Sequence, residues 1–91
     1  MAEMIVEIVS LENSVWTGTA RMVRVRTSEG DIGILPGHEA VAGLLKPGAF
    51  AVDPVDGARL EGTIDAGFVF VDSDRVTIVA DDVELTPAAA A

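Results

Sequence analysis

Residues 60–80 read LEGTIDAGFVFVDSDRVTIVA, and this stretch decides the fold class. Every second residue from Leu60 to Phe70 is apolar or glycine, while the alternate positions begin polar and end with Val69 and Val71. A repeat of two residues is typical of a β-strand, because successive side chains of a strand point to opposite faces of the sheet. We therefore predict an extended run over 60–71 whose last part is apolar on both faces, as in a central strand or one that meets a partner.

Short strands separated by turns also account for the rest of the chain. Valine, isoleucine and threonine dominate the apolar segments, and Gly, Pro, Asp and Ser separate them. Val23 and Val25 share one face of their segment while Arg24 and Arg26 share the other, so one face is buried and the other is wet. The predicted strands include residues 4–9, 16–26, 32–35, 49–52, 60–71, 76–80 and 83–85, with turns at 10–14, 28–31, 54–57 and 72–75. Roughly eight to ten short strands predict an all-β fold, either a sandwich or a small barrel.

Residues 28–39 form the most informative segment between the strands. They contain four glycines or prolines and the single histidine, His38. Gly30 is free to take a positive φ in the turn at 28–31. Loops of such fixed shape suit recognition of a partner, and they equally suit a purely structural double turn. Residues 38–45 fit either two helical turns or an extended connection, and Gly43 weakens the helical alternative.

Length, composition and charge limit the possible functions. Ninety-one residues allow one domain, and 49% hydrophobic residues with a mean hydropathy of +0.42 indicate a packed core. Six basic and fifteen acidic residues give a net charge of −9, which disfavours nucleic acid and anionic membrane surfaces as partners. The chain has no cysteine, and its uncharged apolar stretches are too short for a membrane span, so we expect neither disulfides nor a transmembrane segment.

The residues offer little reactive chemistry. One histidine excludes a multi-histidine metal site, and neither a P-loop around Lys46 nor a Gly-x-Ser-x-Gly nucleophile turn is present. Asp72-Ser-Asp74 resembles the opening of a calcium loop, but Thr77 and Val83 stand where that loop needs glycine and glutamate. For the arginines within 21–26, cross-strand pairing with acids is favoured over an anion site. We therefore expect no catalytic residue, metal ion or cofactor.

Residues 27–38, TSEGDIGILPGH, resemble the hallmark segment of the epsilon subunit of F-type ATP synthases. Further matches follow in the order of that family at Val9-Ser10, Trp16-Thr-Gly18, Lys46-Pro-Gly48, 65–69 and 76–81. Several linked motifs in the right order, over residues 4–84, make the resemblance specific. It implies a β-sandwich of two roughly five-stranded sheets over residues 1–85, in agreement with the strand count, followed by a short alanine-rich tail over 86–91.

The resemblance also implies a mechanical role on the central stalk of a proton-translocating ATP synthase. In the family this domain is held by the gamma subunit and rests on the c-ring, so that c-ring rotation reaches the sites where ATP is made from ADP and phosphate. It implies a non-catalytic subunit without a cofactor, peripheral at the cytoplasmic face of the cell membrane and attached there only through the complex. Carried over by position, the c-ring contacts are Glu29, Gly30 and Asp31, and the gamma contacts are Ser10, His38, Val41 and Ala42. Asp31 stands where relatives commonly have glutamate, so its side chain is one methylene shorter.

Family members typically continue into a two-helix C-terminal domain that can block rotation and, in some bacteria, binds ATP. The resemblance implies that this domain is missing here. The alternative function is a free-standing β-sandwich module that binds a ligand or acts as an adaptor. Such a module needs a concave apolar pocket with convergent polar groups, whereas the stalk role needs an exposed apolar patch around 38–45 or 68–71.

Overall fold

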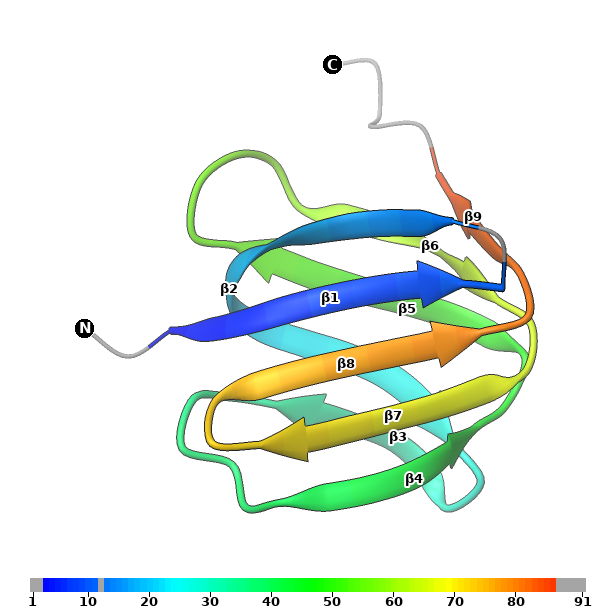
Figure 1. The fold of residues 1–91 in the computed structure, drawn as a ribbon, viewed down its shortest axis with the longest axis horizontal. Coiled ribbons are helices and arrows are strands. Elements are labelled where there is room, and N and C mark those ends of the chain that lie inside the picture. The colour runs from blue at the N-terminus through cyan, green and yellow to red at the C-terminus, as the bar shows by residue number, and fades with distance from the viewer. Residues whose placement is uncertain (1–2, 12, 87–91) are drawn as a thin grey trace.

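The computed structural model describes residues 3–11 and 13–86, and this part of the chain consists of strands joined by turns (Figure 1). The strands are β1 (Met4–Ser10), β2 (Ser14–Thr27), β3 (Gly30–Ile34), β4 (Val41–Leu45), β5 (Gly48–Pro54), β6 (Leu60–Ile64), β7 (Gly67–Asp72), β8 (Arg75–Ala80) and β9 (Val83–Leu85). The prediction of an all-β fold is confirmed. Over these residues there is no helical segment that could span a lipid bilayer. Residues 87–91, most of the predicted alanine-rich tail, lie outside the described residues.

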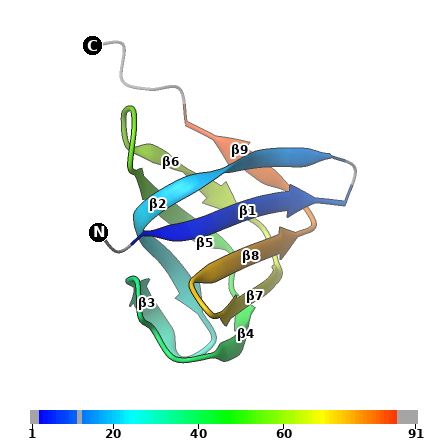
Figure 2. The same ribbon diagram turned by 60° about the vertical axis from the view of Figure 1, so that its left-hand side comes forward.

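The strands form two layers that pack face to face, as Figures 1 and 2 show from two directions. We call the layer with β1, β8, β7 and β4 the front layer, and the layer with β3, β5, β6 and β9 the back layer. The long strand β2 belongs to both, because its first half pairs with β1 and its second half with β3 and β5. The register between β2 and β5 shifts between Ala20 and Met22. Counted with β2, each layer has five strands, and the predicted sandwich is confirmed.

Strand β1 pairs along both of its edges. It runs parallel to β8, with Ile5 opposite Arg75 and Ser10 opposite Ala80, and it runs antiparallel to β2. The remaining strand pairs of residues 3–11 and 13–86 are antiparallel. The front layer is therefore completed by a contact between the first strand and a strand close to the end of the domain.

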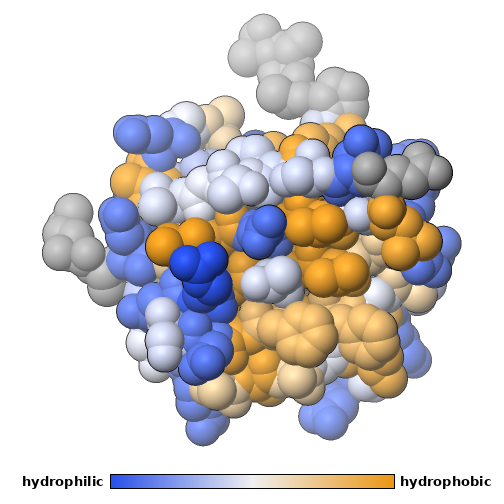
Figure 3. All heavy atoms as spheres, viewed as in Figure 1, coloured by the Kyte–Doolittle hydropathy of each residue, from blue (hydrophilic) through white to orange (hydrophobic). Residues whose placement is uncertain are grey.

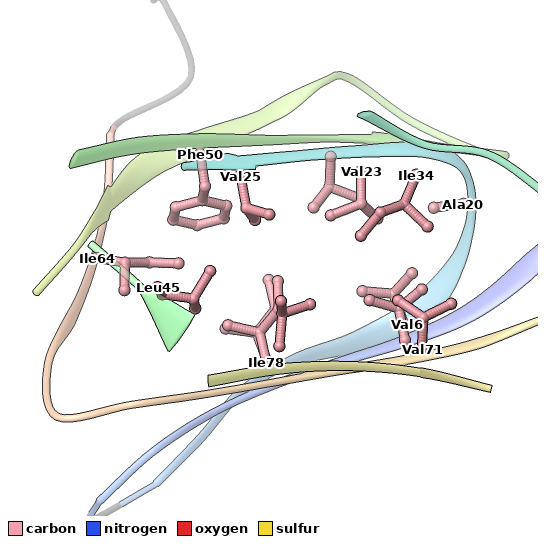
Figure 4. Packing of buried hydrophobic residues seen from close by; sticks show 14 of the residues in the cluster. Val6, Ala20, Val23, Val25, Ile34, Leu45, Phe50, Ile64, Val71 and Ile78 are labelled. Carbon is pink, nitrogen blue, oxygen red and sulfur yellow. The ribbon is translucent and has the colours of Figure 1, made fainter. Parts of the chain in front are cut away.

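The core lies between the layers and is built mainly from aliphatic side chains. Figure 4 shows Val23, Val25 and Phe50 of the back layer pointing toward Val6 and Ile78 of the front layer. The alternation in β2 is as predicted: the valines at 23 and 25 are buried, and the arginines at 24 and 26 are exposed. Side chains that alternate between core and water in this way stabilise a sandwich through burial of apolar area, by about 25 cal/mol per Å².

The predicted single extended run over 60–71 is wrong in one respect. The chain turns at Asp65 and Ala66, which divides the run into β6 of the back layer and β7 of the front layer. The backbone of the segment after β8 fixes this crossing, because the N–H of Asp65 donates to the carbonyl of Asp82 at 3.0 Å and the N–H of Asp81 donates to the carbonyl of Ala66 at 2.9 Å. The run that the sequence pattern predicts as one strand is therefore two strands, which belong to different layers.

The crossing reverses which alternate positions are buried. Ile64 faces the core in β6, whereas in β7 the buried residues are Val69 and Val71. Phe68 and Phe70, which continue the apolar parity of β6, are exposed on the outer surface. The two faces of β7 are both apolar, as predicted, and the outer one is open to solvent.

The segments that the sequence left open are extended rather than helical. Residues 41–45 form β4, which pairs antiparallel with β7 from Val41 opposite Val71 to Leu45 opposite Gly67. The predicted turn at 28–31 contains Gly30 with a φ of 118°, as expected for glycine at this position.

Candidate functional site

The outer surface of the front layer carries a contiguous group of apolar side chains. In register across four strands, Leu44 lies opposite Phe68, Phe68 opposite Val79, and Val79 opposite Val9. We call this surface the apolar face; it consists of Val9, Ala42, Leu44, Phe68, Phe70 and Val79. Leu44, Phe68 and Phe70 are 55%, 49% and 45% exposed. Large side chains that stay this accessible in a folded domain indicate a surface that another molecule covers.

The apolar face is broad and nearly flat. In Figure 3 the hydrophobic residues gather over β7, β8 and the end of β1, with hydrophilic residues around them. The rings of Phe68 and Phe70 stack with their centroids 6.2 Å apart and an angle of 24° between the ring planes. Together with Ala42, Gly43 and Leu44 they line a shallow depression of about 360 Å³. A stacked aromatic pair beside a shallow depression offers a large apolar contact area for a protein surface.

The two neighbouring residues that were predicted to contact gamma in β4 point to opposite sides of the strand. Ala42 lies on the apolar face, opposite Phe70. Val41 is 38% exposed and lines a small crevice of about 110 Å³ at the open edge between the layers, together with Ile32 and Val69. Adjacent residues of a strand alternate between faces, so a single flat partner surface cannot cover both side chains equally.

His38 lies in the loop between β3 and β4, and this loop is attached to the turn between β7 and β8. The N–H of Gly37 donates to Oδ1 of Asp74 at 2.7 Å, and the N–H of His38 donates to the carbonyl of Leu35 at 3.0 Å. The Nδ1 atom of His38 lies 2.8 Å from the carbonyl oxygen of Glu39. The imidazole is therefore held at the end of the front layer where β8 begins.

Ser10 lies at the opposite end of the same layer. It pairs with Ala80, the last residue of β8, and its hydroxyl donates to the carbonyl of Asn13 at 3.2 Å and accepts from the N–H of Asn13 at the same distance. The structure thus places Ser10 and His38 at the two ends of the front layer and does not bring them into contact. The apolar face lies between them.

The predicted c-ring contacts lie at the exposed tip of the β2–β3 hairpin, with Glu29 in the turn and Gly30 and Asp31 at the start of β3, and we call these three residues the turn at 29–31. Thr27, the one buried polar side chain among the described residues, organises this turn: its hydroxyl donates to the carbonyl of Gly30 at 2.8 Å and accepts from the N–H of Glu29 at 3.1 Å. Nε of Arg26 forms an ion pair with the Asp31 carboxylate at 3.1 Å, and both side chains are more than half exposed. The turn therefore presents its carboxylates to solvent in a fixed backbone shape.

Backbone hydrogen bonds join this turn directly to β4. The N–H of Ser28 donates to the carbonyl of Leu44 at 3.0 Å, and the N–H of Lys46 donates to the carbonyl of Arg26 at 3.0 Å. Thr27 also lies opposite Leu45 in the register between β2 and β4. The turn at 29–31 and the apolar face are thus parts of one rigid unit, linked through the strand that contributes Ala42 and Leu44.

The outer surface of the back layer has a different character. Arg24, Ala49, Ala51 and Glu61 line a shallow depression of about 300 Å³ there, and Arg59 pairs with the carboxylates of Asp53 and Glu61 at 3.5 and 3.4 Å. Among the described residues, no three His, Cys, Asp or Glu side chains are grouped in a way that could hold a metal ion. The predicted cross-strand pairing of arginine with acid is found for Arg26 and Asp31.

Sequence reasoning identified the location of the apolar face but not its composition. An exposed patch around 38–45 or 68–71 was expected for the stalk role, and Leu44, Phe68 and Phe70 supply it. Val9 and Val79 were not singled out, because their place beside Phe68 depends on the register of β1 with β8 and of β8 with β7. The apolar character of both faces of residues 68–71 was the available signal.

Comparisons with known proteins agree on one family. Residues 3–86 match the β-sandwich domain of the ATP synthase delta/epsilon chain. The ATP synthase epsilon chain of Rhodococcus erythropolis is 44% identical over 86 residues, which are 93% of this chain and 70% of the relative. The ATP synthase epsilon chain of Micrococcus luteus is 47% identical over 91 residues, which are the full length of both chains.

Solved structures give the same answer for the fold. A chain in the cryo-EM structure of the Euglena gracilis mitochondrial ATP synthase, OSCP/F1/c-ring, superposes with a TM-score of 0.86 at 25% identity, covering 93% of this chain. A chain of the Tetrahymena thermophila mitochondrial ATP synthase, central stalk/c-ring, gives a TM-score of 0.75 at 17% identity over 89% of this chain, a likeness of fold alone. The present chain spans 54% and 65% of the lengths of these two chains.

Proposed function

Because the chain belongs to the ATP synthase delta/epsilon chain β-sandwich family, we propose that it transmits rotation within the central stalk of a proton-translocating ATP synthase. The epsilon chain is a non-catalytic stalk subunit, and the work proposed here is mechanical. The domain binds the gamma subunit through the apolar face and the c-ring through the turn at 29–31. Rotation of the c-ring then reaches gamma, and through it the sites at which ATP forms from ADP and phosphate.

The exposed apolar face is the observation that carries this proposal. A domain with a net charge of −9 that leaves two stacked phenylalanines and a leucine about half exposed has a surface suited to burial against another protein. Two further expected gamma contacts, His38 in the loop before β4 and Ser10 at the end of β1, lie at the two ends of the layer that carries this face. Ala42 lies within it.

Two features suit the turn at 29–31 to a contact with the c-ring. Its carboxylates are exposed, and charged side chains at the rim of an interface fix register and accelerate association more than they add affinity. Its backbone is fixed by Thr27 and attached to β4 through Ser28. A load applied at this turn is therefore passed to the apolar face through hydrogen-bonded backbone rather than through a flexible loop. In the proposed role the domain lies at the cytoplasmic face of the cell membrane, held there by its partners.

The proposal is tested by measuring the binding of purified gamma to the 91-residue chain and to two variants in which an alanine is replaced by aspartate. Ala42→Asp places a carboxylate on the apolar face, and Ala49→Asp places one at an exposed position of the back layer. We expect Ala42→Asp to weaken gamma binding by at least about 10-fold, since an unpaired charge would be buried in the interface, and Ala49→Asp to leave it unchanged. Unfolding midpoints of both variants control for loss of the fold.

A functional assay complements the binding experiment. The wild-type chain should restore proton-coupled ATP synthesis to an ATP synthase depleted of its epsilon subunit, and Ala42→Asp should restore less than Ala49→Asp at equal concentration. A wild-type chain that neither binds gamma nor restores synthesis would refute the proposed function. Equal behaviour of the two variants would refute the assignment of the apolar face as the gamma surface.

A further inference from the structure

Glu7 lies on the outer surface of the front layer, next to the apolar face. In β1 it faces outward, with Thr77 of β8 opposite on one side and Thr17 of β2 opposite on the other. Two residues further along the same face is Val9, a member of the apolar face. The side chain of Glu7 is half-buried. The outward-facing neighbours of this carboxylate are thus Ile5 and Val9 along β1 and Thr17 and Thr77 across the sheet.

Other charged residues on this outer surface lie at its edge. Asp72 and Arg75 pair in register at the turn between β7 and β8. Arg75 is the cation nearest to Glu7 along the sheet, on the diagonal of the Glu7–Thr77 pair, but the ion pairs among residues 3–11 and 13–86 are Arg26–Asp31, Arg59–Asp53 and Arg59–Glu61. In the part of the chain that the structure describes, the Glu7 carboxylate also accepts no hydrogen bond from another side chain.

We propose that the stalk partner that covers the apolar face presents a lysine or arginine to Glu7, and that this pair sets the register of docking. The inference rests on the proposed function, because it specifies the chemistry of the partner at the same surface. Glu7 is then a specificity-determining residue of the interface, while Leu44, Phe68 and Phe70 provide its contact area.

The physical reason is the cost of burying an unpaired carboxylate. A flat partner that covers Val9 and Val79 also removes water from Glu7, which lies on β1 two residues from Val9 and on the same face. Loss of that hydration costs several kcal/mol unless a cation or a set of hydrogen-bond donors replaces it. The face itself supplies two threonine hydroxyls, each with a single proton to donate, and Arg75 forms no ion pair with Glu7 among the described residues, so the proposal assigns the compensating charge to the partner. A single charged pair within an apolar interface also disfavours every shifted register, in which both charges would be unpaired.

Glu7→Gln removes the charge and keeps the shape of the side chain. We expect this variant to raise the Kd for purified gamma by about 10- to 100-fold, because the partner's cation is left buried without its counter-charge. Glu84→Gln is the matched control: it is the same substitution at an exposed position of β9, in the back layer, and should change the Kd less than twofold. Both variants should keep the unfolding midpoint of the wild type. A Kd that is unchanged or lower for Glu7→Gln would overturn the proposal, since the carboxylate would then be either outside the interface or unpaired within it.

The source of the cation is tested in an Arg75→Gln background. If the partner supplies it, Glu7→Gln weakens binding by the same factor with and without Arg75. If Arg75 swings onto Glu7 during docking, the effect of Glu7→Gln disappears when Arg75 is absent, and the proposal is wrong. Failure of the proposed function is recognised separately, because the wild-type chain would then not bind gamma at all.

Discussion

The carboxylate of Asp74 accepts a hydrogen bond from the backbone N–H of Gly37, with 2.7 Å between Oδ1 and the nitrogen. The two residues belong to different turns, the first between β7 and β8 and the second between β3 and β4. Asp74 also accepts from the N–H of Ile5 through its own carbonyl, at 2.9 Å. One residue with a φ of 61° therefore connects β1, the β7–β8 turn and the loop that carries His38.

Asp74→Ala should detach the His38 loop and lower the free energy of unfolding by about 2 kcal/mol. Roughly half of this loss in unfolding free energy comes from the missing hydrogen-bond acceptor, and half from placing alanine in the left-handed region of φ. Asp74→Asn keeps an acceptor oxygen and tolerates this φ, so it should cost less than about 1 kcal/mol. Urea denaturation measures both, and amide exchange of Gly37 should accelerate only in the alanine variant. Equal stability of the two variants would contradict the role given to the side-chain acceptor.

Thr27→Val should loosen the turn at 29–31 while it preserves the packing of a β-branched side chain. The variant leaves the N–H of Glu29 and the carbonyl of Gly30 without their side-chain partner, at a cost of about 1–2 kcal/mol in unfolding free energy. Thr27→Ser retains the hydroxyl and should keep the slow amide exchange of Glu29, even though it loses a methyl group near Gly43. Slow exchange of Glu29 in the valine variant would show that other contacts hold the turn.

Gly62→Ala should displace β9 from the back layer. An added Cβ would collide with the carbonyl oxygen of Glu84 and would lie 2.9 Å from the ring of Phe50, so backbone must move; we expect about 3 kcal/mol of destabilisation. Gly43→Ala is the matched control, since its Cβ would meet Val69 at an ordinary 3.6 Å, and should change stability by less than about 1 kcal/mol. Denaturation midpoints of the two variants provide the comparison, and similar values would argue against close packing of β9 on β6.

Asp31→Asn should leave the fold intact and affect the assembled enzyme. Its ion pair with Arg26 is exposed on both sides, and such pairs contribute less than about 1 kcal/mol to stability. If the turn binds the c-ring as proposed, coupled ATP synthesis in a reconstituted complex should fall and should depend less on ionic strength, because salt screens rim charges and the variant has lost one of them. Asp56→Asn, in the exposed turn after β5, should have no such effect. A normal rate and salt profile for Asp31→Asn would remove this carboxylate from the proposed contact.

Local alternation was sufficient to predict most strands. Val23 and Val25 are buried and Arg24 and Arg26 are exposed, as the two-residue period requires. The period could not reveal the crossing at Asp65 and Ala66, because the apolar parity continues through it from Ile64 to Phe68 while the strand moves to the other layer. Residues 38–45 remained open for a related reason: β4 is extended because it pairs with β7, and that pairing is a long-range contact.

The site was predictable only where it is local. The turn at 29–31 follows from the sequence around Gly30, whose positive φ was expected and is found. The separation of Ser10 from His38 depends on the register of β1 with β8 and on the hydrogen bond between Gly37 and Asp74. Neither of these long-range contacts can be predicted from the local sequence pattern. The opposite orientation of Val41 and Ala42 follows from strand geometry once β4 is known to be extended.

The parallel pairing of β1 with β8 has a consequence for biosynthesis. Ile5 and Ser10 can pair with Arg75 and Ala80 only after β8 has been synthesised, so the front layer cannot close until nearly the whole domain has left the ribosome. Contacts between distant parts of a chain slow folding, since the entropy of a large loop is lost before the contact is made. During translation β1 can pair with β2 early, whereas its other edge stays unpaired until β8 has emerged, so closure of the front layer is a late step of folding.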